Sequence, residues 1–374
     1  MTSGTRGLKG LRRGNKAAVL FLLMREGELS RVRIAAKTGL TGASVTQLCK
    51  ELISEGLVEE SGEVTKSVAG RRETLLRFAG ERIAAVGVNI ESDNTHVSLC
   101  TWNEVLAEEI YPTQMLFERG IDKLNERVAE LASACGGRKF VGVGIAASGI
   151  ADERSGVSVT SYGILPDGLP LAAKVREGTG CEVSLINNVR AQARALITGC
   201  EDDFMLVKHG PGIGCAVISD RVTVSGATGR AGEIGHIVVK EGGEPCRCGK
   251  RGCLEAYVSE KHLTELYRSK TGVELPVSAI YDAFGGDSAA TGVLDESIGL
   301  IAISIGNAAM LLNPARVLVT GGIFSRKPLF DALCEAIDRA GFGGTFAISQ
   351  VGDDKKPKAF SGARHIMLER VFGV

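Results

Sequence analysis

The sequence predicts an α/β protein whose two-lobed body follows a small helical head. From about residue 81 onward, strand-like apolar runs alternate with helical stretches, which is the pattern of an α/β fold. A strand-turn-strand pattern at 82–103 recurs at 203–224, and this repeat indicates two related lobes. The first eighty residues instead contain three short helical segments and an excess of basic side chains.

Length and charge narrow the classes of protein further. The 374 residues suffice for two or three domains with apolar cores of their own. Residues 1–80 contain 14 Lys and Arg against 8 Asp and Glu, a balance of +6, whereas the rest contains 30 against 36, a balance of −6. A basic head on an acidic body predicts that the head binds a polyanion, although a chance clustering of surface charge gives the same count.

We expect a cytoplasmic protein that does not enter a membrane. The N-terminal stretch has charge before an apolar run but no small-residue cleavage site, and the run is too short to cross a bilayer. In the reducing cytosol the ten cysteines are not expected to form a disulfide framework. Seven of them are scattered, and we expect them to be ordinary buried side chains: Cys49, Cys100, Cys135, Cys181, Cys200, Cys215 and Cys334.

Three helices are predicted in the head. The first presents an apolar face at helical spacing and ends at Gly27; the residues of this face are Ala17, Leu20, Leu22 and Leu23. Ser30 is placed to cap a second helix that runs to about Lys37. After a tight turn at 38–42, Thr41 caps a third helix, whose inward residues are Val45, Leu48 and Leu52.

The exposed side of the third helix has the composition of a DNA-recognition surface. Its polar members, which follow Ala43, are Ser44, Thr46, Gln47 and Lys50. In a helix-turn-helix such residues enter the major groove, where Gln47 would pair with adenine and Lys50 with phosphate. The stretch 56–78 is predicted to form a β-hairpin wing for the DNA backbone or minor groove, with Lys66, Arg71 and Arg72 near its tip. A helical bundle that binds protein is the alternative.

One histidine and three cysteines lie within eighteen positions, at His236, Cys246, Cys248 and Cys253. Zinc prefers four nitrogen and sulfur ligands in a tetrahedron, and four protein ligands leave no open position. The sequence therefore predicts one structural zinc ion per chain, in a loop made pliable by Gly242, Gly243, Gly249 and Gly252. A redox pair or inert thiols are the alternatives, although Cys246 and Cys248 are too close for an easy mutual disulfide.

Two glycine-rich turns are ambiguous. The turn at Gly210, Gly212 and Gly214 could cradle a phosphate with backbone N–H groups, but a strand hairpin uses the same residues for plain turn chemistry. The pair Gly321 and Gly322 after a strand is equally ambiguous.

The motif "GEIGH" at 232–236, followed by "CRCGKRGCLE" at 246–255, resembles the signature of the ROK family of repressors and sugar kinases, and the resemblance extends over nearly the whole chain. It implies a two-lobed actin-like ATPase fold whose last helix, here 361–374, returns to the first lobe. The head resembles the winged helix-turn-helix of the repressor branch. The implied domains are 1–80, then 81–186 with 360–374, then 187–359 with the zinc loop.

The resemblance also implies a sugar site between the lobes. In the family, the positions of Glu233 and Glu255 contact sugar hydroxyls, His236 touches both sugar and zinc, and Asn187 adds a further contact beside Asn188. Carboxylates and amides suit sugars because they accept from or bridge adjacent hydroxyls. The alternative is that Glu233 and Glu255 are ordinary charged residues on the protein surface with no role in binding.

Three departures from the kinase pattern argue against catalysis, and a fourth, in the sugar loop, concerns the effector. Asn188 stands where kinases carry the aspartate that acts as general base, and asparagine cannot take up that proton. The first phosphate turn holds Asn89, Glu91, Ser92 and Asp93, whose two carboxylates would repel a nucleotide phosphate. Pro211 replaces a threonine in the second turn and removes a hydroxyl and an N–H. The family's sugar loop is replaced around 160–171.

The leading hypothesis is a sugar-responsive transcriptional repressor that binds double-stranded operator DNA as a dimer or tetramer. A sugar or sugar phosphate would bind between the lobes and release the DNA. The alternatives are a residual ATP-dependent sugar kinase, and a regulator whose body senses a protein partner.

Overall fold

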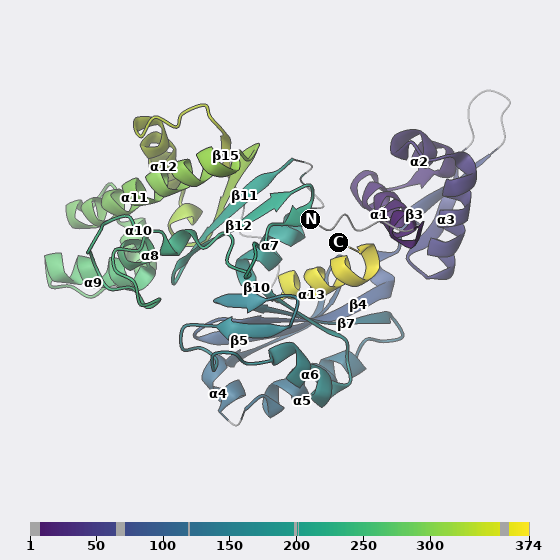
Figure 1. Ribbon diagram of the computed structural model, residues 1–374, viewed down its shortest axis with the longest axis horizontal. Coiled ribbons are helices and arrows are strands. Elements are labelled where there is room, and N and C mark those ends of the chain that lie inside the picture. The colour runs from purple at the N-terminus through teal and green to yellow at the C-terminus, as the bar shows by residue number, and fades with distance from the viewer. Residues whose placement is uncertain are drawn as a thin grey trace. The chain divides into compact units, whose positions relative to one another are not determined.

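The computed structural model describes residues 8–64, 72–118, 120–197, 200, 202–351 and 359–373. The chain divides into two compact units, one made of residues 1–199 with 356–374 and the other of residues 200–355 (Figure 1). The first unit joins the head to an α/β layer, and the three-part division expected from the sequence stays a prediction.

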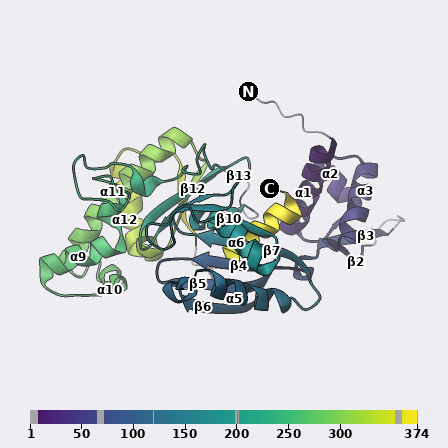
Figure 2. The same ribbon diagram turned by 60° about the horizontal axis from the view of Figure 1, so that its bottom comes forward.

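The head is a three-helix bundle with a small sheet. Its elements are α1 (Leu8–Glu26), β1 (Leu29–Ser30), α2 (Arg31–Thr38), α3 (Gly42–Ser54), β2 (Val58–Val64) and β3 (Glu73–Phe78). The strands form an antiparallel sheet in the order β1-β3-β2, which confirms the wing (Figure 2). Of the residues expected at the tip of the wing, Lys66 and Arg71 lie outside the described residues.

Local side-chain chemistry sets the helix boundaries in the head as predicted. Gly27 follows α1 with a φ of 76°, a conformation that glycine adopts without steric cost. The hydroxyl of Ser30 accepts a hydrogen bond from the Arg33 N–H at the start of α2. Thr41 caps α3 in the same way through the Ser44 N–H.

Helix α1 is buried more widely than one apolar face would require. The four predicted core residues are buried, but Val19 and Phe21 are buried as well. The reason is that α1 also packs against the C-terminal segment, where the Phe21 and Phe372 ring centroids are 4.9 Å apart. Phe78 and Trp102 complete this aromatic junction, because both rings lie within 5.6 Å of the Phe372 ring. The head therefore shares a continuous apolar core with the rest of its unit.

The first unit is built on a five-stranded sheet in the order β10-β7-β4-β5-β6. The strands are β4 (Ile83–Ile90), β5 (Asn94–Thr101), β6 (Val105–Pro112), β7 (Lys139–Ala147) and β10 (Val183–Asn187). Strands β10, β7 and β4 are parallel, and β5 and β6 are antiparallel. Every residue of β4 is buried, as expected of a strand that is covered on both faces.

Helices cover both faces of this sheet. Helices α5 (Asp122–Ser133) and α6 (Leu171–Thr179) lie on one face, and α13 (Phe360–Met367) lies on the other (Figure 1). Helix α13 continues as a π-helical turn, Leu368–Phe372, so the predicted return of the last helix to the first lobe is confirmed. The remaining short elements of the unit are α4 (Thr113–Phe117), β8 (Ile150–Asp152), β9 (Val157–Thr160) and α7 (Asn188–Leu196).

Helix α13 approaches the sheet at two glycines. A Cβ on Gly144 of β7 would collide with the carbonyl oxygen of Gly362, and one on Gly87 of β4 would collide with that of Ala359. The helix backbone therefore rests almost directly on the strands, a packing distance that larger side chains would not allow.

The second unit repeats this plan with the sheet order β13-β12-β11-β14-β15. The strands are β11 (Phe204–His209), β12 (Ile213–Ser219), β13 (Val222–Thr223), β14 (Arg316–Thr320) and β15 (Ala347–Gln350). Like β4 and β5, strands β11 and β12 form an antiparallel hairpin whose first strand has a parallel neighbour, β14. The sequence repeat that indicated two related lobes is thus seen in the strands.

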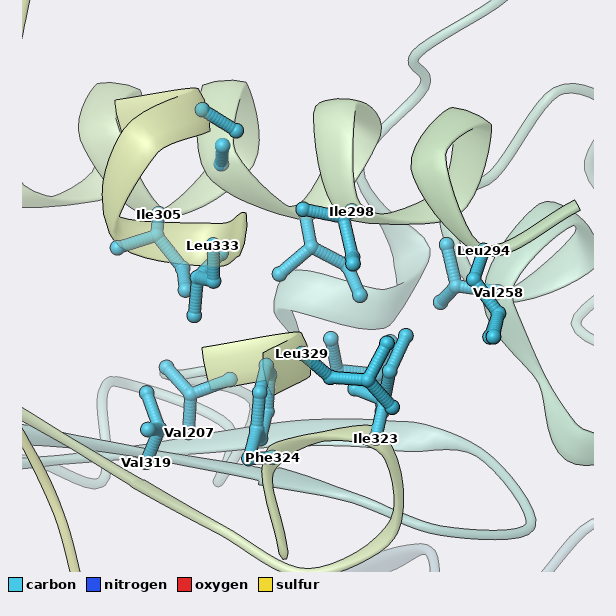
Figure 3. Close-up of a cluster of buried hydrophobic side chains, with 14 of the residues drawn as sticks. Val207, Val258, Leu294, Ile298, Ile305, Val319, Ile323, Phe324, Leu329 and Leu333 are labelled. Atoms are coloured by element: carbon cyan, nitrogen blue, oxygen red, sulfur yellow. The ribbon is translucent and has the colours of Figure 1, made fainter. Parts of the chain in front are cut away.

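The core of the second unit lies between this sheet and two helices, α11 (Ser288–Leu312) and α12 (Lys327–Arg339). Figure 3 shows Ile298 and Ile305 of α11 facing Val207 and Val319 of the sheet. Among the described residues, α11 is the one helix with the length and apolarity to cross a membrane, but 56% of its most apolar window is buried inside the protein. Its apolar character therefore fits a core helix. The smaller helices are α8 (Glu255–Val258), α9 (Glu260–Thr271) and α10 (Val277–Asp282).

The scattered cysteines are less uniformly buried than expected. Cys49, Cys100 and Cys215 are buried, but the other four are only half-buried: Cys135, Cys181, Cys200 and Cys334. Cys135, Cys181 and Cys200 lie in the segments that follow helices, and Cys334 lies on α12. None of the four is on a strand of a sheet.

Candidate functional site

The predicted zinc ligands meet in one loop of the second unit. The Cys248 and Cys253 sulfurs are 3.6 Å apart, and the Cys246 sulfur is 3.6 Å from Nδ1 of His236. All four ligand atoms lie within 4.8 Å of one another. A tetrahedral zinc ion with Zn–S of about 2.3 Å and Zn–N of about 2.0 Å separates its ligands by roughly 3.5–3.8 Å. These spacings fit a metal ion and are too long for a disulfide.

Glycines let the loop close around this group. The Cys246 N–H donates to the Lys250 carbonyl and the Gly249 N–H to the Cys246 carbonyl, which forms a tight knuckle. Gly249 and Gly252 have φ values of 87° and 78°. A Cβ on Gly252 would also collide with the Lys240 carbonyl, so this position accepts glycine alone.

Burial changes the protonation of two members of the group. Burial, together with the neighbouring thiols, raises the pKa of the Cys253 thiol to about 12. Burial also lowers the pKa of the His236 imidazole, which keeps the ring neutral as a metal ligand requires. The second ring nitrogen of His236, Nε2, lies 3.8 Å from a Glu233 carboxylate oxygen, where a carboxylate can orient a ligating imidazole.

Glu255 is buried, so it is not ordinary surface charge. It is the first residue of α8 and is 8% exposed. One carboxylate oxygen accepts from Nε of Arg247 at 2.8 Å, and the other accepts from Nη2 of Arg247 and from the Ile213 N–H, both at 3.3 Å. Sequence reasoning missed Arg247, although its place between two predicted zinc ligands was a signal that this side chain would be held near the site.

Asn187 and Asn188 lie in the other unit, where the structure gives both amides local partners. The side-chain oxygen of Asn187, Oδ1, caps α7 by accepting from the Val189 and Arg190 N–H groups, and its side-chain NH2 group donates to the Gly149 carbonyl. The Asn188 amide donates to the Ser148 hydroxyl at 3.1 Å. The meeting of these asparagines with Glu233, His236 and Glu255 in one sugar site stays a prediction.

The first phosphate turn links β4 to β5. The Thr113 N–H donates to the Asp93 carbonyl, and the Thr113 hydroxyl donates to the Glu91 carbonyl. Two carboxylate side chains, those of Glu91 and Asp93, thus stand on a turn whose carbonyl groups are fixed by a neighbouring helix terminus. A phosphate group that approached this turn would meet two carboxylates.

The two glycine-rich segments lie next to a buried histidine, His209. The turn at 210–214 follows it directly in the chain, and Gly321 and Gly322 pack against it. His209 is 1% exposed; its Nε2–H donates to the Val258 carbonyl at 2.7 Å, and its Nδ1 accepts from the Ile323 N–H at 3.2 Å. A Cβ on Gly322 would collide with the imidazole. Packing against His209 is therefore a sufficient reason for glycine at position 322.

His209 makes the stability of the second unit depend on pH. Burial lowers the pKa of this imidazole to about 4, against 6.5 in an unfolded chain. Below pH 6.5 the His209 imidazole is therefore protonated in the unfolded state, whereas in the folded state it stays neutral down to about pH 4. The stabilisation is complete above pH 6.5 and is lost as the pH falls to 4, by about 3 kcal/mol.

We expect the unfolding free energy to fall between pH 7 and pH 5, and His209→Gln to flatten that slope. Chemical denaturation at several pH values measures it, with His96→Gln as the control because His96 lies beside Glu108 in the other unit. An equally steep loss in the His209→Gln protein would contradict this account.

The third helix of the head presents the predicted surface. The predicted residues Ala43, Ser44, Thr46, Gln47 and Lys50 are exposed, and the predicted inward residues Val45, Leu48 and Leu52 are buried together with Cys49. The Thr46 hydroxyl donates to the Gly42 carbonyl, and the Gln47 amide donates to a Glu51 oxygen at 3.0 Å. Sequence reasoning did not anticipate the second contact.

Glu51 connects the exposed face of α3 to α1. Arg12 and Lys16 of α1 form ion pairs with this carboxylate, and their hydrogen bonds, with that of Gln47, lower its pKa to about 2. Two basic residues therefore stand at the edge of α3. No local signal predicts this, because they lie more than thirty residues away along the chain.

Comparisons with known proteins agree with these features. A model of the ROK family matches residues 85–349, and a model of the MarR family matches residues 9–72. The chain is 27% identical over 358 residues to the xylose repressor of Caldicellulosiruptor bescii, with 89% of each chain covered. It is 30% identical over 344 residues to the DNA-binding transcriptional dual regulator NagC of Escherichia coli, with 83% of this chain and 80% of the relative covered.

A solved ROK family transcriptional regulator, a homolog of the E. coli MLC protein, has the same fold. It superposes with a TM-score of 0.82 at 21% sequence identity, and the match covers 97% of both chains. The match includes the head as well as both lobes of the body, because so little of either chain is left out.

Proposed function

The chain belongs to the ROK family, and from that premise we propose that it is a sugar-responsive, DNA-binding transcriptional repressor of carbohydrate-utilisation genes. The observation that carries the proposal is the exposed polar face of α3 on a MarR-type head that continues into a ROK body. The xylose repressor and NagC, which resemble this chain over most of its length, are named as regulators of the same kind.

The proposed DNA contact is made by two heads of a homo-oligomer, a dimer or a tetramer. Each α3 would lie in a major groove, one helical turn from the other, on a pseudo-palindromic operator in double-stranded DNA. Ser44, Thr46 and Gln47 would face base edges, and Lys50 would contact phosphate. Arg72 at the wing would add backbone contact, with Lys66 and Arg71 proposed from the sequence alone.

The proposed effector is a sugar or sugar phosphate that contacts Glu233, His236 and Glu255, with Asn187 and Asn188. It would release the DNA by favouring a body arrangement whose heads no longer fit the operator. For this the effector must prefer one arrangement, and a tenfold preference corresponds to about 1.4 kcal/mol. The aromatic junction supports such coupling, because Phe21 and Phe78 of the head pack against Phe372 in the turn that follows α13.

The proposed zinc ion is structural. His236, Cys246, Cys248 and Cys253 would fill its coordination sphere, so it would carry no substrate water. When bound, the ion would fix the loop that leads into α8, whose first residue is Glu255. We propose no catalytic role for the chain, because Asn188 has no basic group for a sugar hydroxyl and the first phosphate turn is acidic.

Substitutions on α3 distinguish contacts to DNA bases from contacts to phosphate. Lys50→Ala should weaken operator and unrelated DNA alike and reduce the salt dependence of binding by about one unit, as expected for one lost phosphate contact. Gln47→Ala should weaken the operator selectively, by about 1–3 kcal/mol. Fluorescence anisotropy with both DNAs at several salt concentrations measures this.

Lys261→Ala is the matched control for these variants, because that lysine is exposed on α9 in the second unit. It should change neither affinity. If Gln47→Ala, like Lys50→Ala, weakened both DNAs equally, Gln47 would not be a base contact and the predicted docking of α3 would be wrong.

A further inference from the structure

Arg247 covers the buried carboxylate that the effector is expected to contact. The Glu255 side chain is 10% exposed, whereas that of Arg247 is 51% exposed. The guanidinium grips the carboxylate with Nε on one oxygen and Nη2 on the other, a fork geometry that only arginine provides. In this pair, arginine is the outer partner and glutamate the inner one.

The hydrogen-bonding capacity of Glu255 is largely used within the protein. A carboxylate offers about four acceptor positions. Two are filled by Arg247 and a third by the Ile213 N–H, so Glu255 cannot accept from two adjacent sugar hydroxyls while this arrangement holds.

The surrounding backbone holds the pair in place. A Cβ on Gly212 would collide with the Glu255 carboxylate and lie 3.4 Å from Nη2 of Arg247. The glycine turn therefore packs against both charged groups. Arg247 also lies between Cys246 and Cys248, so the proposed zinc ion would fix its backbone on both sides.

These contacts reverse the chemistry that the site presents. A bare glutamate presents acceptors to the hydroxyl donors of a neutral sugar, but arginine presents N–H donors, and its positive charge balances the charge of the carboxylate. The Lys250 ammonium, which donates to the His236 carbonyl at 2.6 Å, adds positive charge on this side of the loop. The group that faces Arg247 should therefore be an acceptor, and an anionic one would gain most.

From this we infer that Arg247 is a specificity-determining residue that selects an effector with a negatively charged group, a sugar phosphate or a sugar acid. The inference rests on the proposed function and narrows its effector. It predicts that a charged sugar derivative binds at least tenfold more tightly than its neutral parent. The preference should depend on Arg247 through its fork of N–H donors and not through charge alone.

The test is isothermal titration of the full-length, zinc-loaded protein at fixed low salt. The ligands are matched sets, each with a neutral sugar, its phosphate ester and its sugar acid, and inorganic phosphate alone shows what a bare anion contributes. The proteins are the wild type, Arg247→Gln, Arg247→Lys and, as control, Arg268→Gln, an exposed arginine on α9. Zinc content is measured for each, because a displaced loop would change it.

The inference expects Arg247→Gln to keep its zinc and to bind the charged and neutral members within about threefold of each other. Arg247→Lys should keep part of the preference, and Arg268→Gln all of it. The phosphate and acid arms identify which anion is selected. A purely structural Arg247 would lower affinity for both members and leave their ratio unchanged, which would overturn the inference.

Equal or tighter binding of the neutral sugar by the wild type would also overturn it, while the repressor proposal would stand if that sugar released DNA. Binding of no sugar in any set would overturn the inference and the effector part of the proposed function together, and operator binding would still test the rest.

Discussion

Replacing Cys253 by serine should reduce the zinc content from about one ion per chain to nearly none. Cys253 is fully buried beneath the other ligands, and a serine hydroxyl is a poor ligand for zinc beside two thiolates. Without the ion, the loop from His236 to Glu255 is left with crowded thiols and few apolar contacts of its own. We expect a loss of stability on the order of 3 kcal/mol, or about 6–12 °C in the unfolding temperature of a domain of this size.

The same variant should lose its response to the effector but keep its affinity for operator DNA, because the core that holds the head contains no residue of the second unit, where the loop lies. Elemental analysis, thermal unfolding and DNA binding measure the three effects. Cys334→Ser is the control, since this half-buried thiol lies on α12 outside the ligand group. Full zinc content in the Cys253→Ser protein would show that the four residues are not the ligand set.

Adding one methyl group at Gly144 should be among the most damaging changes in the chain. Its Cβ would enter the carbonyl oxygen of Gly362, which is backbone and cannot turn aside. Helix α13 must then lift from β7, and its other contact at Gly87 is equally tight. Since α13 leads into Phe372 of the aromatic junction, we expect Gly144→Ala to cost more than about 4 kcal/mol and to abolish specific DNA binding.

Gly299→Ala is a matched control, because it adds the same methyl group at a helical glycine of α11 with no atom within 4 Å. That change should be neutral or stabilise by up to about 1 kcal/mol, since alanine favours the helix. Chemical denaturation measures both variants. Stability of the Gly144→Ala protein within about 0.5 kcal/mol of the wild type would contradict the close approach of α13 to the sheet.

Local features of the head and of the metal ligand group could be predicted because their causes are local. Ser30 and Thr41 cap helices through N–H groups three residues away. The four metal-ligand candidates lie close together in the sequence, which was enough to predict that one loop holds them. The repeated strand-turn-strand pattern likewise indicated two related sheets, because the two strands of each hairpin are neighbours in the sequence.

Features that depend on distant partners were missed. The burial of α1 on more than one face depends on Phe372, which lies at the other end of the chain. Arg247 and Glu255 both belong to the recognised motif, but their pairing follows from how the loop folds onto α8. Asn187 was expected to contact sugar, yet its amide also caps α7, a role that requires knowing where the helix begins.

The measurement that tests the central claim most directly is fluorescence anisotropy of the zinc-loaded protein on DNA from upstream of its own gene. It is titrated at fixed salt with neutral sugars, sugar phosphates and sugar acids, because non-specific binding by a basic head varies steeply with salt. The account predicts specific binding that one class of sugar derivative releases and the others leave intact. Specific binding that no sugar alters would contradict the sugar-responsive part of the claim and point to a protein partner, and the absence of specific binding to any operator would contradict the regulatory role itself.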